Sequence, residues 1–314
     1  MRLAWWPGHT HGRYSGSAWY AEAEWQALHE RAIAYFNVDI VGSRGAVTNC
    51  VRNQMGELAG FTAALLRRFA IPVPEKEAAF NARSLKRSER YVAPTRPTRG
   101  SDQSFWGVGL SSMQVSSFLA EDDPDHLPNS GLAWWWHTEQ DTIDKFDPAI
   151  LARDTELHAR MVLALAEASI LPLDLAQTAA DVLAALREYR EAAPALIELI
   201  ELERDAEAFA AAARAFTARI AHLSAEAETA PVNRVLLRAV HRVNPVIYQK
   251  CSPFEQDRAT PTRLLPGLAA ALQLSALPRD AARMARVRLR RERNRIRQAL
   301  IDATRLLDAP IAVA

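Results

Sequence analysis

The chain has 314 residues, 49% of them apolar and 24% charged, which is typical of a globular protein large enough for two domains. The formal net charge is +1, so the whole-chain charge gives no indication of a nucleic acid or a membrane surface as partner. Cys50 and Cys251 are far apart in sequence, which excludes a cysteine metal motif and makes a disulfide framework a poor interpretation.

The first 170 residues alternate strand-like and helix-like segments. We expect a short buried strand at Arg2–Trp6, a helix at Ala18–Ala32 and a β-rich run at Ile33–Asp39 that ends on a carboxylate. The same reading predicts strands over residues 46–51 and 110–115 and helices over residues 55–69 and 148–168. Such alternation is typical of an α/β layer structure.

From Leu171 onward no segment has the pattern of a strand, and apolar residues recur at helical spacing. Four helices are predicted, over residues 182–189, 196–223, 235–243 and 289–307. Prolines that we expect to separate these helices stand at Pro231, Pro245, Pro253, Pro261, Pro266 and Pro278. We therefore predict an α/β domain over residues 1–170 and an all-α bundle over residues 171–314.

His137 directly follows three tryptophans, Trp134–Trp136. Bulky aromatic side chains exclude water and can hold a neutral imidazole with one nitrogen aimed inward, as a zinc ligand needs. A histidine beside aromatic residues is also commonly a hydrogen-bonded core residue, and this alternative stays open.

Further residues able to bind a metal follow two predicted strands. His9 and His11 lie in a glycine-flanked turn after Trp6, and Asp39 ends the next strand. In open α/β sheets ligands gather at the carboxyl ends of strands, where histidine and carboxylate can converge on zinc. The alternatives are an exposed turn for the histidines and a turn cap for Asp39.

Ser101 and Asp102 form a fourth candidate, in a loop that starts at Gly100 and precedes a Gly-x-Gly segment. Such a pair can hydrogen-bond a ligand or orient a metal-bound histidine, and an ordinary solvent-exposed loop explains it equally well.

In this order the segments resemble the di-zinc aminopeptidase family that contains glutamate carboxypeptidase II and the transferrin receptor. Four stretches carry the resemblance: Trp5–Ser17, Tyr35–Asp39, Gly100–Phe105, and Trp136–Thr138 with Asp141-Thr142 and Phe146–Pro148. Later stretches are similar to the helical dimerisation domain of the receptor-like branch: Ala168–Asp174, Asn244-Pro245, Ser252–Phe254, Leu265–Leu268 and the closing helix.

The resemblance implies a zinc-exopeptidase-like sandwich with a mixed sheet, a homodimer formed through the helical domain, and a two-zinc site that hydrolyses peptide bonds. In such a site zinc lowers the pKa of a bound water, a base takes its proton, and the hydroxide attacks the peptide carbonyl. By the same resemblance Asp39 and His137 bind different zinc ions, and Ser101 and Asp102 lie near the substrate or behind the metal ligands.

Two departures from the family bear on activity. The family's His-x-Asp, which supplies one zinc ligand and the bridging aspartate, has no counterpart in this sequence, so we expect a C-terminal fragment or one subunit of a split protein. The family's pair of glutamates is replaced by His9-Thr10-His11, in a loop one residue longer. Either histidine can replace the zinc-binding carboxylate, and His9 is the candidate for the base.

The sequence thus predicts an impaired zinc metallopeptidase, with a non-catalytic, receptor-like dimerisation protein as the alternative. A peptide substrate is expected if the chain is active, and a separate N-terminal peptidase segment is a further expected partner. Arginines crowd residues 283–297, but no aromatic residues are interleaved and the acidic stretch 198–205 can pair with them, so we expect no nucleic-acid partner. The sequence contains no apolar run of transmembrane length and no signal peptide pattern, and it leaves the compartment open.

Overall fold

The computed structural model describes residues 1–6, 14–68, 103–120, 122–128, 130–193, 199–223, 228–257 and 263–311. Contacts divide the chain into two compact units. The helical unit comprises Met1–Tyr35, Thr98–Ser111 and Ser169–Ala314, and the sheet unit comprises Phe36–Pro97 and Ser112–Ala168. The N-terminal helices thus group with the C-terminal bundle, and the sequence-based division into domains at residue 170 stays a prediction.

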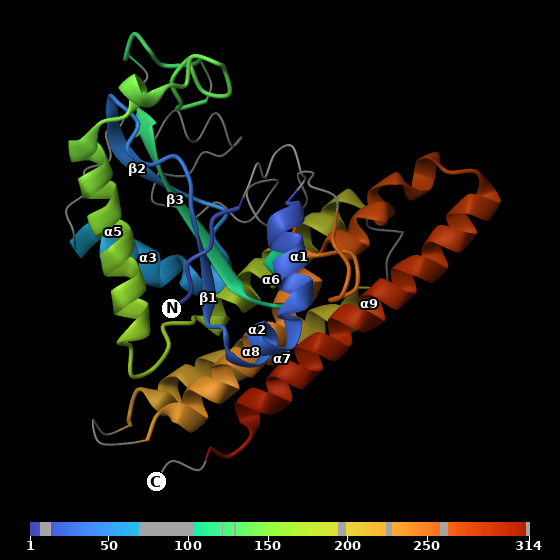
Figure 1. Cartoon of the computed structure of the whole chain (residues 1–314). Coiled ribbons are helices and arrows are strands. Elements are labelled where there is room, and N and C mark those ends of the chain that lie inside the picture. Colours follow the sequence, from blue (N-terminus) through green and yellow to red (C-terminus); the bar gives the residue numbers. More distant parts are fainter. Residues whose placement is uncertain are drawn as a thin grey trace. The chain divides into compact units, whose positions relative to one another are not determined.

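A small mixed sheet has three strands in the order β1-β3-β2: β1 (Ala34–Val38), β3 (Ser111–Leu119) and β2 (Ala46–Arg52) (Figure 1). β2 pairs antiparallel with β3, with Ala46 opposite Leu119 and Arg52 opposite Gln114. All nine residues of β3 are buried, as expected of a central strand.

The other elements of the sheet unit are η1 (Gly56–Leu58), α3 (Ala59–Arg68), η3 (Ile143–Lys145) and α5 (Pro148–Ala166). α5 begins where a sequence rule places it, because Asp147 caps the backbone N–H groups of Ala149 and Ile150 at 2.8 and 3.1 Å and proline occupies the first helical position. Its buried side has the helical spacing Asp154, Leu157, Met161 and Leu165.

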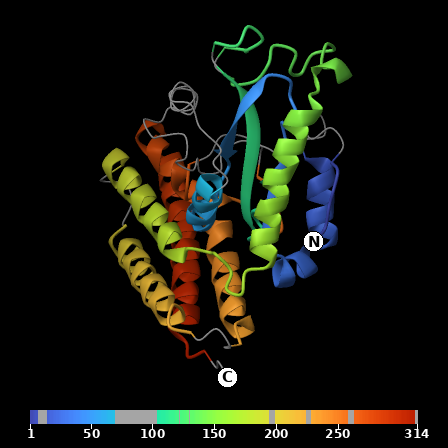
Figure 2. The same ribbon diagram turned by 90° about the vertical axis from the view of Figure 1, so that its left-hand side faces the viewer.

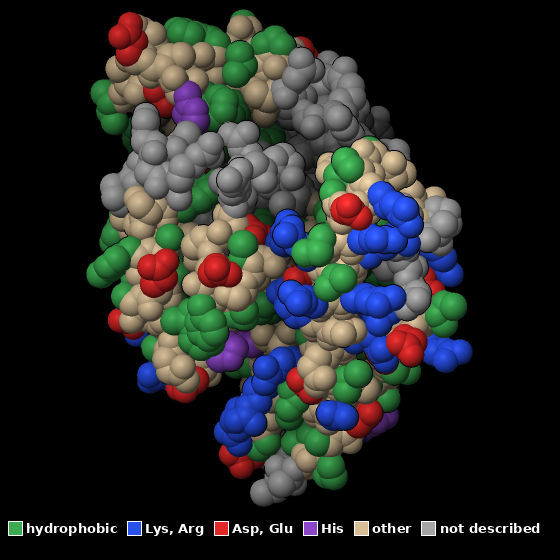
Figure 3. Space-filling model, turned by 90° about the vertical axis from the view of Figure 1, so that its right-hand side faces the viewer, with side chains coloured by type: hydrophobic (Ala, Val, Ile, Leu, Met, Phe, Trp, Pro, Cys, Tyr) green, Lys and Arg blue, Asp and Glu red, His purple; other side chains and the backbone are tan. Residues whose placement is uncertain are grey.

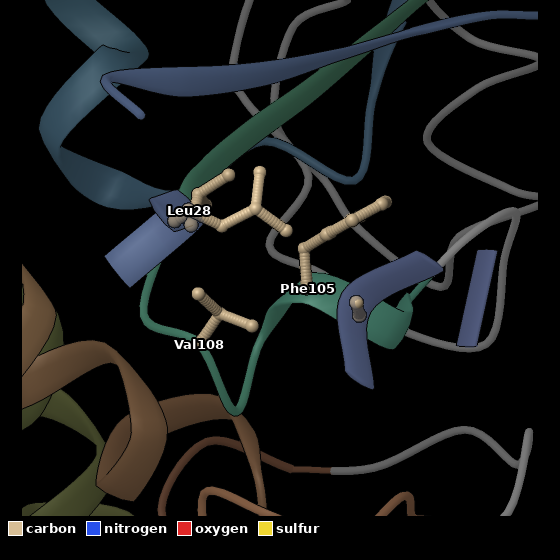
Figure 4. Packing of buried hydrophobic residues seen from close by; sticks show 5 residues of the cluster. Leu28, Phe105 and Val108 are labelled. Carbon is tan, nitrogen blue, oxygen red and sulfur yellow. The ribbon is translucent and has the colours of Figure 1, made fainter. Parts of the chain in front are cut away.

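The N-terminal part of the helical unit contains α1 (Ser15–Ala23), α2 (Trp25–Arg31) and η2 (Gln103–Phe105). Leu28, Phe105 and Val108 form the centre of its hydrophobic core together with Ala21 and Leu110 (Figure 4). This core joins the N-terminal helices to the segment that leads into β3.

The helical bundle contains α6 (Leu175–Ala192), α7 (Ile200–Ile220), α8 (Ala230–Tyr248), η4 (Pro266–Ala276) and α9 (Arg279–Asp308) (Figure 2). Each of the four long helices buries an apolar stripe, and α9 packs against α7, α8 and η4. None of the helices within the described ranges is long and apolar enough to span a membrane.

Arginine side chains fix how α9 lies against its neighbours. Arg297 forms ion pairs with Glu201 and Asp205 in the first turns of α7, and Arg219 near the end of α7 donates to the Leu307 carbonyl at 2.7 Å. α7 and α9 therefore run parallel, with α7 beginning opposite Arg297. Arg295 donates to three carbonyls at the end of α8, those of Gln249, Lys250 and Cys251.

The strand predicted at Arg2–Trp6 was wrong. These residues form no strand, and Leu3 and Trp5 are 69% and 84% exposed. Trp6 packs with its ring centroid 5.6 Å from that of Tyr20 and 6.3 Å from that of Phe105, and Arg2 donates to Tyr20 and Glu24. A short apolar run is buried as a strand only where a neighbouring strand pairs with it, and sequence pattern alone does not supply that neighbour.

Three other predictions need smaller corrections. The helix expected over residues 18–32 is two helices, α1 and α2, separated at Glu24. Pro245 does not separate helices, because it lies inside α8, whereas Pro231 stands in the first turn of α8, after the break that follows α7. The strand expected over residues 110–115 continues to Leu119, since Ser116 and Ser117 are buried despite their polarity.

Candidate functional site

Asp39 lies directly after β1, and its half-buried carboxylate is hydrogen-bonded to a side chain of the central strand. The buried Gln114 donates from Nε2 to Asp39 Oδ2 at 3.4 Å and to Ser116 Oγ at 3.0 Å. Gln114 Oε1 in turn accepts from Asn53 Nδ2 at 3.1 Å. The chain of hydrogen bonds Asn53–Gln114–Asp39 orients the carboxylate at the carboxyl end of β1.

The backbone turns sharply after Asp39. Ile40 has φ of 61°, a left-handed conformation that costs a β-branched residue about 1–3 kcal/mol. Its carbonyl accepts from the N–H of Ser117 at 2.8 Å, which holds the turn against β3. Strain of this kind persists only where surrounding contacts enforce it, and it is concentrated at functional sites.

The three tryptophans before His137 have different environments. Trp135 is 3% exposed and packs with Ala46, Leu119 and Ala133 in the core of the sheet unit. Trp134 and Trp136 are 46% and 39% exposed. The expected water-excluding wall is therefore reduced to one buried ring.

His137 is exposed, and its ring is stacked on that of Trp136 with centroids 3.9 Å apart. Its φ of 61° is again left-handed, which is uncommon outside glycine. The core-histidine alternative is excluded, because the ring lies at the surface within the described part of the chain. The inward orientation expected of a zinc ligand is not observed for this ring either.

The segments that carry Asp39 and His137 are joined through the backbone. The N–H of Arg44 donates to the carbonyl of Lys145 at 2.8 Å, and the N–H of Asp147 donates to the carbonyl of Gly42 at 2.9 Å. The segment that follows β1 and the segment that follows His137 are thus hydrogen-bonded to each other within the sheet unit.

The other predicted site residues, His9, His11, Ser101 and Asp102, lie outside the described residues. Within the described ranges no three His, Cys, Asp or Glu side chains gather as a metal centre. Asp39 and His137 have donor atoms that suit zinc, an oxygen and an imidazole nitrogen, but a zinc site needs at least three protein ligands. The described residues alone therefore do not fit a zinc ion.

Asp154 is the residue of this region that sequence reasoning missed. It is completely buried in α5 and accepts from the N–H of Gly42 at 3.0 Å, Ser117 Oγ at 2.5 Å and the Arg153 guanidinium at 2.9 Å. Burial alone raises the pKa of this carboxyl, but the hydrogen bonds from Ser117, Gly42 and Arg153 outweigh it, so the pKa is lowered overall. Asp154 anchors the loop that follows Asp39. Its sequence signal was a charge on the apolar stripe of a predicted helix.

A second buried group lies in the helical unit. His241 of α8 is 6% exposed, and its ring centroid lies 5.1 Å from that of His29 in α2. Burial and the neighbouring His29 lower the pKa of His241 to about 4. His29 Nδ1 lies 2.9 Å from the carbonyl of Val108, so the pair ties α2, α8 and the 103–111 segment together. We expected no role for these histidines from sequence.

No protein-family model matches this chain, and no curated protein matches it.

Proposed function

We propose that this chain is a metallopeptidase-like protein, with the C-terminal part of a zinc-exopeptidase-like α/β domain followed by a dimerisation bundle. The order of the four sequence stretches supports this proposal. The structural observation that carries it is the pair of left-handed residues at the candidate ligands, Ile40 beside Asp39 and His137 itself, on segments joined by the Arg44–Lys145 and Asp147–Gly42 hydrogen bonds.

In this proposal Asp39 and His137 are metal-binding positions, and Gln114 orients the Asp39 carboxylate as second-layer partners of metal ligands commonly do. His11 or His9 supplies a further zinc ligand, His9 is the candidate base, and Ser101 and Asp102 lie near the substrate. Because the described residues do not complete a zinc site, activity depends on donors from outside them.

A non-catalytic, receptor-like protein that keeps the peptidase fold is the second candidate. It is favoured by the exposed position of His137 and by the absence of a third metal donor among the described side chains. Both candidates share a homodimer formed through the helical domain, which light scattering at micromolar concentration tests directly.

The deciding experiment measures zinc bound by the full chain and its hydrolysis of aminoacyl-anilides and acidic dipeptides, with and without a chelator. The enzyme proposal expects bound zinc and chelator-sensitive turnover, both reduced at least tenfold by Asp39→Asn and by His137→Gln, in line with loss of a metal ligand or its partner. Matched controls are Asp308→Asn and His222→Gln, which change exposed residues elsewhere. Absence of both zinc and turnover selects the non-catalytic candidate.

A further inference from the structure

The N-terminal half of α9 extends beyond the helices that cover the rest of it. α7 begins opposite Arg297 and α8 ends opposite Arg295, so Arg279–Asn294 lies past both contacts. η4 packs on this part so closely that a Cβ added at Gly267 would lie 2.4 Å from Glu292 Oε2. We call Arg279–Asn294 the α9 arm. Most of its side chains are exposed, and only Leu289 is buried.

The α9 arm concentrates positive charge. Residues 279–291 contain six arginines and one aspartate, a formal charge of +5 over about 18 Å of helix. Because the whole chain carries only +1, the remaining residues carry −4. Within the described ranges Arg286, Arg288, Arg290 and Arg291 form no ion pair, and the acidic start of α7 pairs with Arg297 instead. Figure 3 shows Lys and Arg side chains gathered on this face of the molecule.

This charge opposes the stability of the helix that carries it. Arginines in the first turns of a helix face the positive end of its dipole, and like charges at i, i+4 spacing repel, each effect costing about 0.3–1 kcal/mol. α9 begins with Arg279 and has no side-chain cap at its first turn. Asp280 in the first turn pairs with Arg283 at 3.7 Å and offsets part of this cost, but it is a single carboxylate among six arginines. Where a sequence departs from local stability rules, a functional reason is the usual explanation.

The arginines lie in two rows along the α9 arm. Arg279, Arg283, Arg286 and Arg290 follow the spacing i, i+4, i+7, i+11 along one flank. Arg288 and Arg291 lie along the other flank. Val287, which is 46% exposed, lies between the rows on the outward side, as does Asp280 in the first turn. Met284, which is 60% exposed, lies on the second flank between Arg288 and Arg291.

We propose that the α9 arm binds a nucleic-acid duplex, lying in its major groove with the two arginine rows against the two phosphate backbones. An α-helix is about 10–12 Å across and the major groove of B-DNA about 12 Å wide, so both rows reach phosphates while Val287 faces the base edges. Arginine suits phosphate because its planar guanidinium forms paired hydrogen bonds.

Two other polyanions fit this surface less well. An acidic partner helix contacts one face of α9 and leaves one arginine row unpaired. An anionic membrane requires a broad apolar face, and two half-exposed side chains do not provide one. The sequence-based expectation of no nucleic-acid partner relied on the lack of interleaved aromatic residues, which bears on base stacking in single strands, and on the acidic stretch pairing with these arginines. Among the described residues of that stretch, Glu201 and Asp205 pair with Arg297 and Glu203 pairs with Arg190 of α6, so none of them pairs with an arginine of the α9 arm, and we replace that expectation.

The test uses the full chain and a labelled mixed-sequence DNA duplex of about 20 base pairs, with fluorescence anisotropy at about 50–200 mM salt. We expect a micromolar Kd at the lowest salt and a fall of log K with log salt of slope about −4, from four to five phosphate contacts. The variant Arg288→Gln/Arg291→Gln should weaken binding about tenfold or more and reduce the slope by about 2.

The matched control is Arg214→Gln/Arg305→Gln, which removes the same charge from exposed positions outside the α9 arm. Equal losses in the two double variants would overturn the proposal, as would binding too weak to detect at about 100 µM protein and 50 mM salt. Binding to phosphatidylserine vesicles without binding to the duplex would also overturn it. Circular dichroism should show both variants folded, because the changed side chains are exposed. The outcome is independent of zinc binding, so it separates this inference from the proposed metallopeptidase function.

Discussion

The buried carboxylate of Asp154 accepts a hydrogen bond from the backbone N–H of Gly42 at 3.0 Å. This bond links the middle of α5 to the loop that carries Asp39 away from β1. Because Ser117 Oγ and the Arg153 guanidinium complete the shell around the same carboxylate, one side chain holds α5, β3 and the loop together.

Removing this carboxylate should destabilise the sheet unit. Asp154→Ala leaves the Gly42 N–H without its acceptor and Arg153 without its ion pair. Because the Arg153 side chain is 37% exposed and can be solvated, we expect a loss of about 2–4 kcal/mol, mainly from the buried donors. Ser117→Ala removes a single hydrogen bond and should cost about 1–2 kcal/mol. Urea unfolding followed by tryptophan fluorescence measures both. Equal effects of the two variants would contradict the central role of Asp154.

Asp154 also predicts an acid sensitivity. Its pKa is lower in the folded than in the unfolded state, so its contribution to stability is present above the unfolded value, near 3.9, and is lost as the pH falls through the folded pKa. The free energy of unfolding of the parent chain should therefore fall more steeply below about pH 4 than that of Asp154→Asn.

His241 predicts a second pH dependence in a different range. Burial and His29 lower its pKa to about 4 from an ordinary 6.5, so below pH 6.5 the unfolded chain binds a proton that the folded chain does not. The stability of the helical unit should fall by roughly 3 kcal/mol between pH 6.5 and pH 4 and level off below. His241→Phe should flatten this slope, whereas the exposed control His222→Phe should keep it. An unchanged slope in His241→Phe would refute the prediction.

Two glycines provide a matched pair of substitutions. Gly109 has φ of 94°, and an added Cβ would lie 2.7 Å from the Cα of His241, so Gly109→Ala should cost several kcal/mol. At Gly60 in α3 an added Cβ would meet no neighbouring atom within 4 Å in the described part of the chain, and Gly60→Ala should stabilise by roughly 0.5–1 kcal/mol. The midpoints of thermal unfolding should shift in opposite directions, and a shift in the same direction would contradict the described packing.

Substitutions of the tryptophans before His137 should also lower the free energy of unfolding by unequal amounts. Trp135→Ala removes a core ring and should cost about 3–5 kcal/mol, whereas Trp136→Ala should cost less, because Trp136 is 39% exposed and Trp135 only 3%. Chemical denaturation of the two variants separates these values. Similar losses would show that Trp136 is buried in solution.

Some parts of the site could be predicted from the sequence, and others could not. The strand before Asp39 and the start of α5 at Asp147 follow from local rules, alternation in one and capping in the other. Asp154 is buried beside Gly42, and His241 is buried beside Gly109. Each partner lies more than 100 positions away in the sequence, and no local pattern predicts such a contact.

Pro245 shows how tertiary contacts overrule a local rule. Proline has no N–H, so α8 loses the bond to the carbonyl of His241, and a helix end was the reasonable expectation. In the structure Gly109 packs closely against that backbone and Asn244 Nδ2 donates to the Gly109 carbonyl at 3.4 Å, so the helix continues.

The sequence by itself determined the helical bundle, the strand leading to Asp39 and the density of arginine in α9, because periodicity, capping and charge are written in neighbouring residues. Only the tertiary structure decided which of these features are buried, paired or exposed. Trp135 enters the core while Trp136 and His137 stay at the surface, and Arg297 finds carboxylates while Arg288 does not. The physical reason is that burial and charge pairing depend on which distant segments meet, and a local pattern does not contain that information.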